Sequence, residues 1–293
     1  MSDPGIERGE VHLDARDGVA ALANDKGELL VWRGEWHATP TSLDVADDVL
    51  VADDGSVLLM ANDEIHRFGV DGQSSVAFKA PQHRDLVSMQ HRPEGGLLVL
   101  ACHEMYLLDP SLEVREVIAS ESIGCGRLAA FTSRGDLVVI GASEHEVVVH
   151  DAKGDVHRPA KKRGTRALLG HPSGVVVAAR NERITGSDQA SIHRTVIESS
   201  HDGRTWTQEK VIEGAVTSMA MTGDGTILIA LASQRVLAWS LGTQRMVELP
   251  SVEGHGALRP LALQADGRST FVAGHWAGEN RVARFEASCD APP

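Results

Sequence analysis

The feature that most constrains the fold is a short apolar run that follows a glycine and recurs seven times along the chain. One copy reads "GDLVVIGA" and another "GTILIALA". The glycines that open the runs are Gly18, Gly55, Gly95, Gly135, Gly174, Gly225 and Gly267. Their successive spacings are 37, 40, 40, 39, 51 and 42 residues. A period of about 40 residues indicates a repeat architecture.

Each repeat has the same internal order. A half-apolar segment such as "VTSMAMT" leads into a tight turn such as "TGDG", whose glycine supplies the positive φ that hairpin turns need. The apolar run follows, then an alternating segment such as "EVVVH", another turn and a polar fourth segment. Four antiparallel strands that repeat radially predict a blade, and the whole pattern predicts an all-β, seven-bladed β-propeller.

The repeats divide residues 1–293 into blades of a single expected domain. The last repeat has no evident fourth strand after "NRVARFEA", so residues 1–9 are expected to supply it and remove an exposed edge. The expected blades span residues 10–42, 43–81, 82–122, 123–163, 164–213, 214–255 and 256–288.

Composition limits the classes of partner. The chain has 293 residues, is 42% hydrophobic and carries a formal charge of −13, which disfavours nucleic acid and anionic membranes. No segment has an apolar run long enough to span a bilayer, and the polar N-terminus resembles no signal peptide. The three cysteines predict free thiols in a reducing compartment, so we expect a cytoplasmic monomer.

The stretch "SSHDGRTW" at residues 199–206 resembles the Asp-box, or BNR repeat, of sialidase-like propellers, with one residue fewer between its Asp and Gly. The resemblance, shared more loosely with WD40-like repeat proteins, implies a structural turn between the third and fourth strands of a blade. Sialidase chemistry is not expected to accompany it, because the one tyrosine, Tyr106, lies in a predicted third strand. The matching residues are Ser200, Asp202, Gly203, Thr205 and Trp206.

By propeller convention, the loops between strands two and three and between blades share one face, which usually binds ligands. These loops are rich in histidine and basic residues, although loops are polar in general and the enrichment also fits solvation alone. The candidate partner-binding residues are His83, Arg84, His103, Glu104, Lys161, Lys162, Arg163, Arg180, Glu182, His255, Arg259, His275 and Trp276.

A charge pattern marks the same face. The residue that opens the third strand is acidic in blades one to four, serine in blade five and arginine in blades six and seven. The pattern predicts either a surface that orients a partner by complementary charge or ordinary solvated strand ends. The insertion at 180–191 is likewise a recognition element or a tolerated loop. The strand-opening residues are Glu28, Glu64, Glu104, Glu146, Ser191, Arg235 and Arg281.

Catalytic and metal-binding signatures are weak. Cys102, His103 and Cys125 form the best local set of metal ligands, but they lack the close pair spacing of a structural zinc site, so neither metal nor cofactor is expected. No nucleophile elbow or Walker loop occurs, and "GCGRLA" at 124–129 leads into a predicted strand. Streptogramin-lyase-like propellers, which use His and Glu with Mg²⁺ on this face, offer an analogy without a matching stretch.

The sequence therefore predicts a non-catalytic bacterial scaffold that binds a protein partner through the ligand-face loops. Two alternatives stay open. One is an enzyme, lyase-like or glycan-hydrolysing, and the other is a glycan-binding lectin, each with its site at the central mouth and a small molecule or glycan as its ligand.

Overall fold

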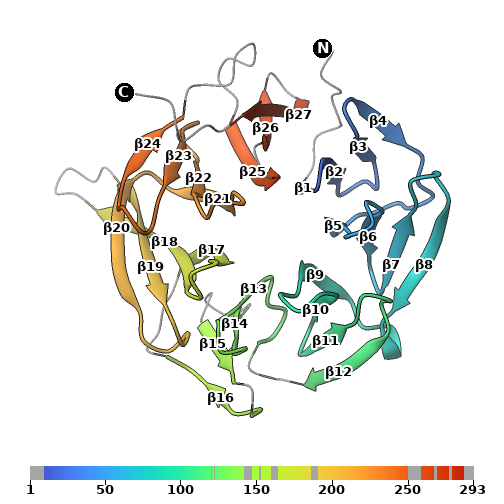
Figure 1. Cartoon of the computed structure of the whole chain (residues 1–293), viewed down its shortest axis with the longest axis horizontal. Coiled ribbons are helices and arrows are strands. Elements are labelled where there is room, and N and C mark those ends of the chain that lie inside the picture. The colour runs from blue at the N-terminus through green and yellow to red at the C-terminus, as the bar shows by residue number, and fades with distance from the viewer. Residues whose placement is uncertain are drawn as a thin grey trace. The chain divides into compact units, whose positions relative to one another are not determined.

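The computed structural model describes residues 10–119, 121, 123–141, 147–151, 153–159, 164–185, 191–249, 259–266, 269–276 and 279–286. Nearly all the regular structure in them is β-strand, labelled in chain order in Figure 1. The exception is a three-residue 3₁₀ helix, η1 (Pro81–His83). Within the described part of the chain, no helix is long and apolar enough to cross a membrane.

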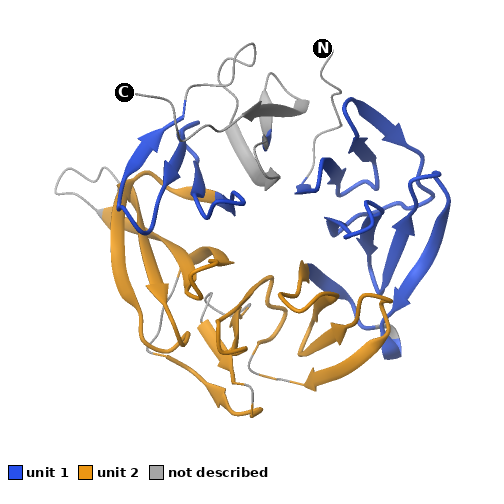
Figure 2. Ribbon diagram, in the orientation of Figure 1, with its two compact units in different colours: residues 1–89, 218–293 blue, residues 90–217 orange. Residues whose placement is uncertain are grey.

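The strands form antiparallel sheets in which each strand pairs with the next along the chain, as expected of a β-propeller. Two compact units contain them, residues 1–89 with 218–293 and residues 90–217 (Figure 2). Strands β9 and β21 each cross a boundary between the units.

The first unit contains the following strands. They are β1 (Val11–Arg16), β2 (Val19–Asn24), β3 (Leu29–Trp32), β4 (Trp36–Thr39), β5 (Asp48–Val51), β6 (Val57–Ala61), β7 (Glu64–Phe68), β8 (Ser74–Lys79), the start of β9 (Leu86–His91), most of β21 (Val216–Met221), β22 (Ile227–Leu231), β23 (Val236–Trp239), β24 (Met246–Glu248), β25 (Arg259–Asp266), β26 (Ser269–Trp276) and β27 (Glu279–Glu286).

The second unit contains the remaining strands. They are β10 (Leu97–Ala101), β11 (Glu104–Leu108), β12 (Val114–Ala119), β13 (Leu128–Phe131), β14 (Leu137–Ile140), β15 (Val147–His150), β16 (Val156–His157), β17 (Thr165–Gly170), β18 (Val176–Thr185), β19 (Ser191–Ser200) and β20 (Thr207–Glu213).

The all-β propeller class is confirmed, but the blade count needs correction. Six sheets have four strands, and the seventh, β25–β26–β27, has three among the described residues. The last repeat has no evident polar segment after β27, so only three strands of the expected seventh blade are present among the described residues. The expected closure by residues 1–9 lies outside the described residues.

Three of the glycines that open the apolar runs occupy the same position in equivalent turns. Gly55, Gly95 and Gly135 have φ values of 75°, 88° and 81°, a region that favours glycine. The amide of each donates to the carbonyl three residues earlier, so the three turns are equivalent, as the repeat alignment predicts. The strands that follow are buried along their whole length in β6, β10 and β14.

The buried second strands pack into layers between blades. In the first unit, Ala21 and Val31 of the first blade meet Val49, Val57 and Leu59 of the second. Small and β-branched side chains let these sheets stack closely, in keeping with the low aromatic content of 4%. Each buried Val or Leu contributes about 1.5–3 kcal/mol relative to an exposed one, so these layers dominate the stability of the unit.

Candidate active site

Two aspartates of the first unit join the innermost strands of successive blades. Strands β1 and β5 are edge strands of their sheets, so part of their backbone has no partner within the sheet. Asp14 on β1 accepts a hydrogen bond of 2.7 Å from the Val51 amide on β5. Asp48 on β5 accepts one of 2.7 Å from the Met89 amide on β9. The carboxylates therefore satisfy edge amides that a neighbouring strand would otherwise have to satisfy.

Asp48 also faces an imidazole from the preceding blade. His12 Nδ1 lies 3.8 Å from Asp48 Oδ1, and their side chains are 18% and 19% exposed, so both remain partly accessible. The pKa of Asp48 is raised to about 7, chiefly by burial, with the negative charges of Asp14 and Asp47 adding to the rise. The hydrogen bonds from the Met89 and Val49 amides oppose that rise without cancelling it.

A carboxyl group that titrates near neutrality next to an imidazole can both take up and release a proton at physiological pH. Its dense surroundings give it the raised pKa, while its side chain stays 19% exposed. His12 and Asp48 therefore form the candidate active site of the first unit.

The sequence analysis overlooked this pair, although a signal was available. Within "VHLDAR", His12 and Asp14 alternate with apolar residues and so share one face of an inner strand. Polar side chains on such a face need a partner from the neighbouring blade, and "DVLV" opens with Asp48. Neither residue lies in a loop, and the predicted binding residues were sought in the loops.

The predicted partner-binding residues are dispersed rather than gathered in one described site. His103 is exposed with a φ of 68°, and its amide donates to the Gly124 carbonyl at 2.7 Å. The Glu104 carboxylate accepts a hydrogen bond of 2.5 Å from the Tyr106 hydroxyl. Lys161, Lys162, Arg163 and His255 lie outside the described residues, as do the side chains of His83, Arg259, His275 and Trp276; Arg84 is half-buried after η1.

Arg180 and Glu182 are brought together, and both lie on the long hairpin of β18 and β19. Glu182 bonds Arg180 and also accepts a hydrogen bond of 2.6 Å from Arg194 Nε. These two hydrogen bonds, that from Arg194 first, lower the pKa of Glu182. The described residues of the insertion, 180–185 and 191, therefore extend β18 and β19, and the charges of Arg180, Glu182 and Arg194 are paired along the two strands.

Two of the residues that open the third strands, Glu64 and Arg235, also pair within their own blades. Glu64 lies 2.6 Å from Lys79 Nζ on the next strand, and that hydrogen bond lowers the pKa of Glu64. Arg235 lies 2.8 Å from Glu248 on β24. These contacts favour ordinary strand-end pairing over a surface that orients a partner.

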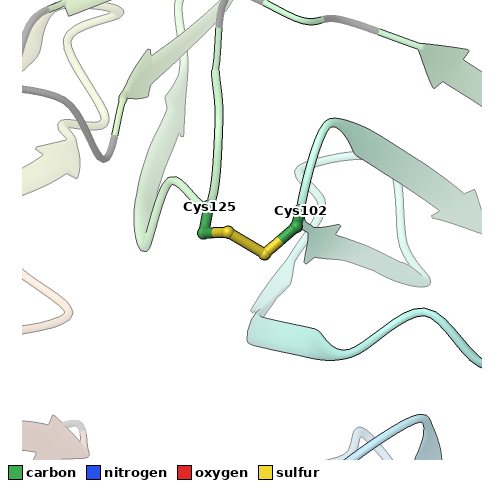
Figure 3. Close-up of a disulfide and its surroundings, with 2 residues drawn as sticks. All are labelled: Cys102 and Cys125. Atoms are coloured by element: carbon green, nitrogen blue, oxygen red, sulfur yellow. A yellow bond between two sulfur atoms is a disulfide. The ribbon is translucent and has the colours of Figure 1, made fainter.

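The expectation of free thiols is wrong for two of the three cysteines. Cys102 and Cys125 form a disulfide with a Cα–Cα distance of 4.0 Å (Figure 3). It joins the turn between β10 and β11 to the segment that leads into β13. Because two of the three cysteines are bonded, cysteine usage no longer indicates a reducing compartment. Bonded sulfurs also offer no thiolate to a metal.

The histidine–glutamate–Mg²⁺ arrangement of streptogramin-lyase-like propellers does not fit the described residues. Among them, no group of three or more His, Cys, Asp or Glu side chains could hold a metal ion. The loops at 143–146 and 253–258 lie outside the description. We therefore derive no step through a metal.

Residues 199–206 form the turn between β19 and β20, as the motif predicts. Asp202 Oδ1 accepts hydrogen bonds of 2.8 Å from the amides of Arg204 and Thr205. Trp206 Nε1 donates to the Gly203 carbonyl at 2.8 Å, and Ser200 Oγ donates to the Thr205 carbonyl at 2.6 Å. These bonds lock the turn locally, which is a structural role.

The fold and the His12–Asp48 pair define a β-propeller with an acid–base pair on its inner strands. No family model and no curated protein matches the sequence. Similar solved structures include a selenomethionine-substituted virginiamycin B lyase from Staphylococcus aureus, with a TM-score of 0.68, 10% identity and 94% coverage of each chain. A catalytically inactive histidine-to-alanine variant of that lyase with quinupristin has a TM-score of 0.70 at 10% identity, covering 96% of this chain and 98% of the other.

A streptogramin B lyase structure gives a TM-score of 0.69 at 10% identity and covers 97% of this chain and 96% of the other. At this identity the likeness establishes the fold. The similar structures are nevertheless named as enzymes, which overturns the expectation of a non-catalytic scaffold and favours its lyase-like alternative.

Proposed function

We propose that this protein is a lyase-like enzyme whose proton-transfer groups are Asp48 and His12. The observation that carries the proposal is the partly accessible carboxyl group with a pKa of about 7, 3.8 Å from an imidazole. The full-length fold similarity to propellers named as lyases supports the reaction class. A more specific kinship with Asp-box or WD40-like proteins rests on residues 199–206 alone.

The two groups match what an elimination requires. Asp48, as carboxylate, takes the proton from a carbon next to a carbonyl, and the C–H electrons form a carbon–carbon double bond. The bond from the adjacent carbon to the leaving group breaks, and the leaving atom takes that electron pair. A protonated His12 then gives its proton to the leaving atom, so no water is consumed and charge is conserved.

The test uses quinupristin, the compound bound in one of the similar lyase structures, together with small carbonyl compounds that carry an acyloxy group on the β-carbon. Mass spectrometry distinguishes elimination, which adds no atoms, from hydrolysis, which adds one water to each bond broken. A new ultraviolet absorbance of the conjugated double bond gives the rate.

We expect Asp48→Asn to lower the rate constant by about a hundredfold or more, with His12→Gln having a similar effect. The matched control is Asp54→Asn in the same blade, because Asp54 is bound to Ser56 and Arg67 in an outer turn. Wild-type activity should rise with pH through about 7, as Asp48 becomes a base, and fall again at higher pH, where His12 is no longer protonated to act as the acid. Products that contain added water, or full turnover by both site variants, would contradict the proposal.

A further inference from the structure

A groove between the first and second blades forms a second candidate site in the first unit. Its volume is about 200 Å³, enough for a small molecule rather than a large ligand. Val31, Val57 and Phe68 give it an apolar floor that belongs to the core layer between the blades. Val70, on the turn between β7 and β8, is 67% exposed and covers one side.

The polar side chains that line the groove can all donate hydrogen bonds. Arg33, His37 and Thr39 line it, and none of the described lining residues is an Asp or Glu. Arg33 Nη2 donates to the Gly55 carbonyl at 2.7 Å, which fixes the guanidinium while most of its five donors face elsewhere.

One carboxylate lies near the rim. Glu35 Oε1 is 3.4 Å from His37 Nε2, and the two side chains are 78% and 58% exposed. A pair that exposed is held weakly, so an anion in the groove can compete for the imidazole. Replacing Glu35 should therefore change the affinity of the groove for an anion.

We propose that this groove binds a small organic acid with an apolar body, such as a short-chain or aromatic carboxylic acid. The apolar part lies on Val57 and Phe68, and the carboxylate is held by Arg33, with help from His37. A guanidinium accepts a carboxylate through paired hydrogen bonds, while an apolar floor favours an aliphatic chain or ring over a bare inorganic anion. The site is separate from His12 and Asp48 and does not depend on the proposed lyase activity.

The test compares hexanoate and benzoate with their neutral amides, hexanamide and benzamide, by ligand-observed NMR and calorimetry on the full chain. We expect the acids to bind with dissociation constants near the millimolar range, as suits ligands of this size, and the amides to bind about tenfold more weakly. Inorganic phosphate, which has no apolar part, should not compete with hexanoate.

Variants then assign the binding to this groove. Arg33→Gln should weaken hexanoate binding about tenfold, Arg33→Lys should restore part of it, and Glu35→Gln should strengthen it. The matched control is Arg134→Gln, which removes another exposed arginine from a turn in the second unit. Equal binding of acids and amides, or equal effects of Arg33→Gln and Arg134→Gln, would overturn the proposal, and competition by phosphate would point to a general anion site instead.

Discussion

Asp48 on an inner strand and two aspartates in the outer turns respond oppositely to the fold. In the first unit, Asp48 is half-buried near two other carboxylates, and its pKa rises to about 7. In the second unit, Asp109 and Asp151 occupy turns between third and fourth strands, and their pKa values fall to about 2. The turn carboxylates accept hydrogen bonds from backbone amides and neighbouring side chains, which stabilise the ionised form.

The difference separates a functional environment from a structural one. The Asp151 pKa is lowered first by the hydrogen bond from His157 and then by the amides of Asp155 and Lys153. Such a group stays ionised at all physiological pH values and serves to hold its turn. Asp48, by contrast, can exchange a proton near neutrality, which is why we assign it the chemistry and the turn aspartates the scaffolding.

The largest stability effect expected is that of the disulfide in the second unit. Replacing Cys102 and Cys125 by serine removes a cross-link between residues 23 apart in sequence, and the loss is about 3 kcal/mol on the chain-entropy account. Urea unfolding measures the loss. If the disulfide and the surroundings of Asp48 are independent, the pH dependence of stability that Asp48 causes should be the same with and without the disulfide. A change in that dependence would show that the disulfide affects the surroundings of Asp48.

Asp48→Asn tests the inner-strand side of the comparison directly. Because folding raises this pKa above its ordinary value of 3.8, the folded state retains its proton longer than the unfolded state does. Wild-type stability should therefore fall as the pH rises from about 4 to about 7, by up to a few kcal/mol relative to the variant. Unfolding by urea at a series of pH values gives both curves, and parallel curves would contradict the raised pKa.

Gly203→Ala tests how firmly an outer turn is fixed. The glycine has a φ of 68°, and an added Cβ would lie 2.6 Å from Val138 Cγ2 and 2.8 Å from Val149 Cγ2 of the preceding blade. Strain and crowding together should cost about 1 to 2 kcal/mol. The matched control is Gly154→Ala, also at positive φ (89°) but with open space around the added carbon, which should cost less. Equal losses in thermal unfolding would show that backbone strain alone is responsible.

The repeated glycine turns and the buried second strands were predictable because both depend on residues close in sequence. Gly55 and the run after it specify a hairpin turn and a buried strand without reference to the rest of the chain. The His12–Asp48 pair depends on which inner-strand positions meet across two blades, which the repeat period does not determine. The disulfide was missed for a similar reason, since Cys102 and Cys125 meet only when a turn and the following inter-blade segment are placed side by side.

The predicted location and oligomeric state depend on other arguments. Once Cys102 and Cys125 are bonded, cysteine usage no longer supports a cytoplasmic location, and that location stays an untested prediction. The monomeric state also stays a prediction. Neither bears on the chemistry assigned to Asp48, which rests on its surroundings within the first unit.

The smallest effect expected is that of Asp151→Asn, and its pH profile should be the reverse of that of Asp48→Asn. The pKa of Asp151 is lowered in the fold, so the stability it contributes is present above about pH 4 and is lost as the pH falls through about 2. The wild-type protein should therefore unfold at a slightly higher temperature than Asp151→Asn at pH 7, with the two converging in strong acid. Arg204→Gln provides the matched control, because it removes the 3.1 Å ion pair to Asp151 and leaves the turn amides bonded. If Asp151→Asn instead showed a stability change centred near pH 7, inner and outer aspartates would not differ in kind, and the assignment of proton transfer to Asp48 would lose its basis.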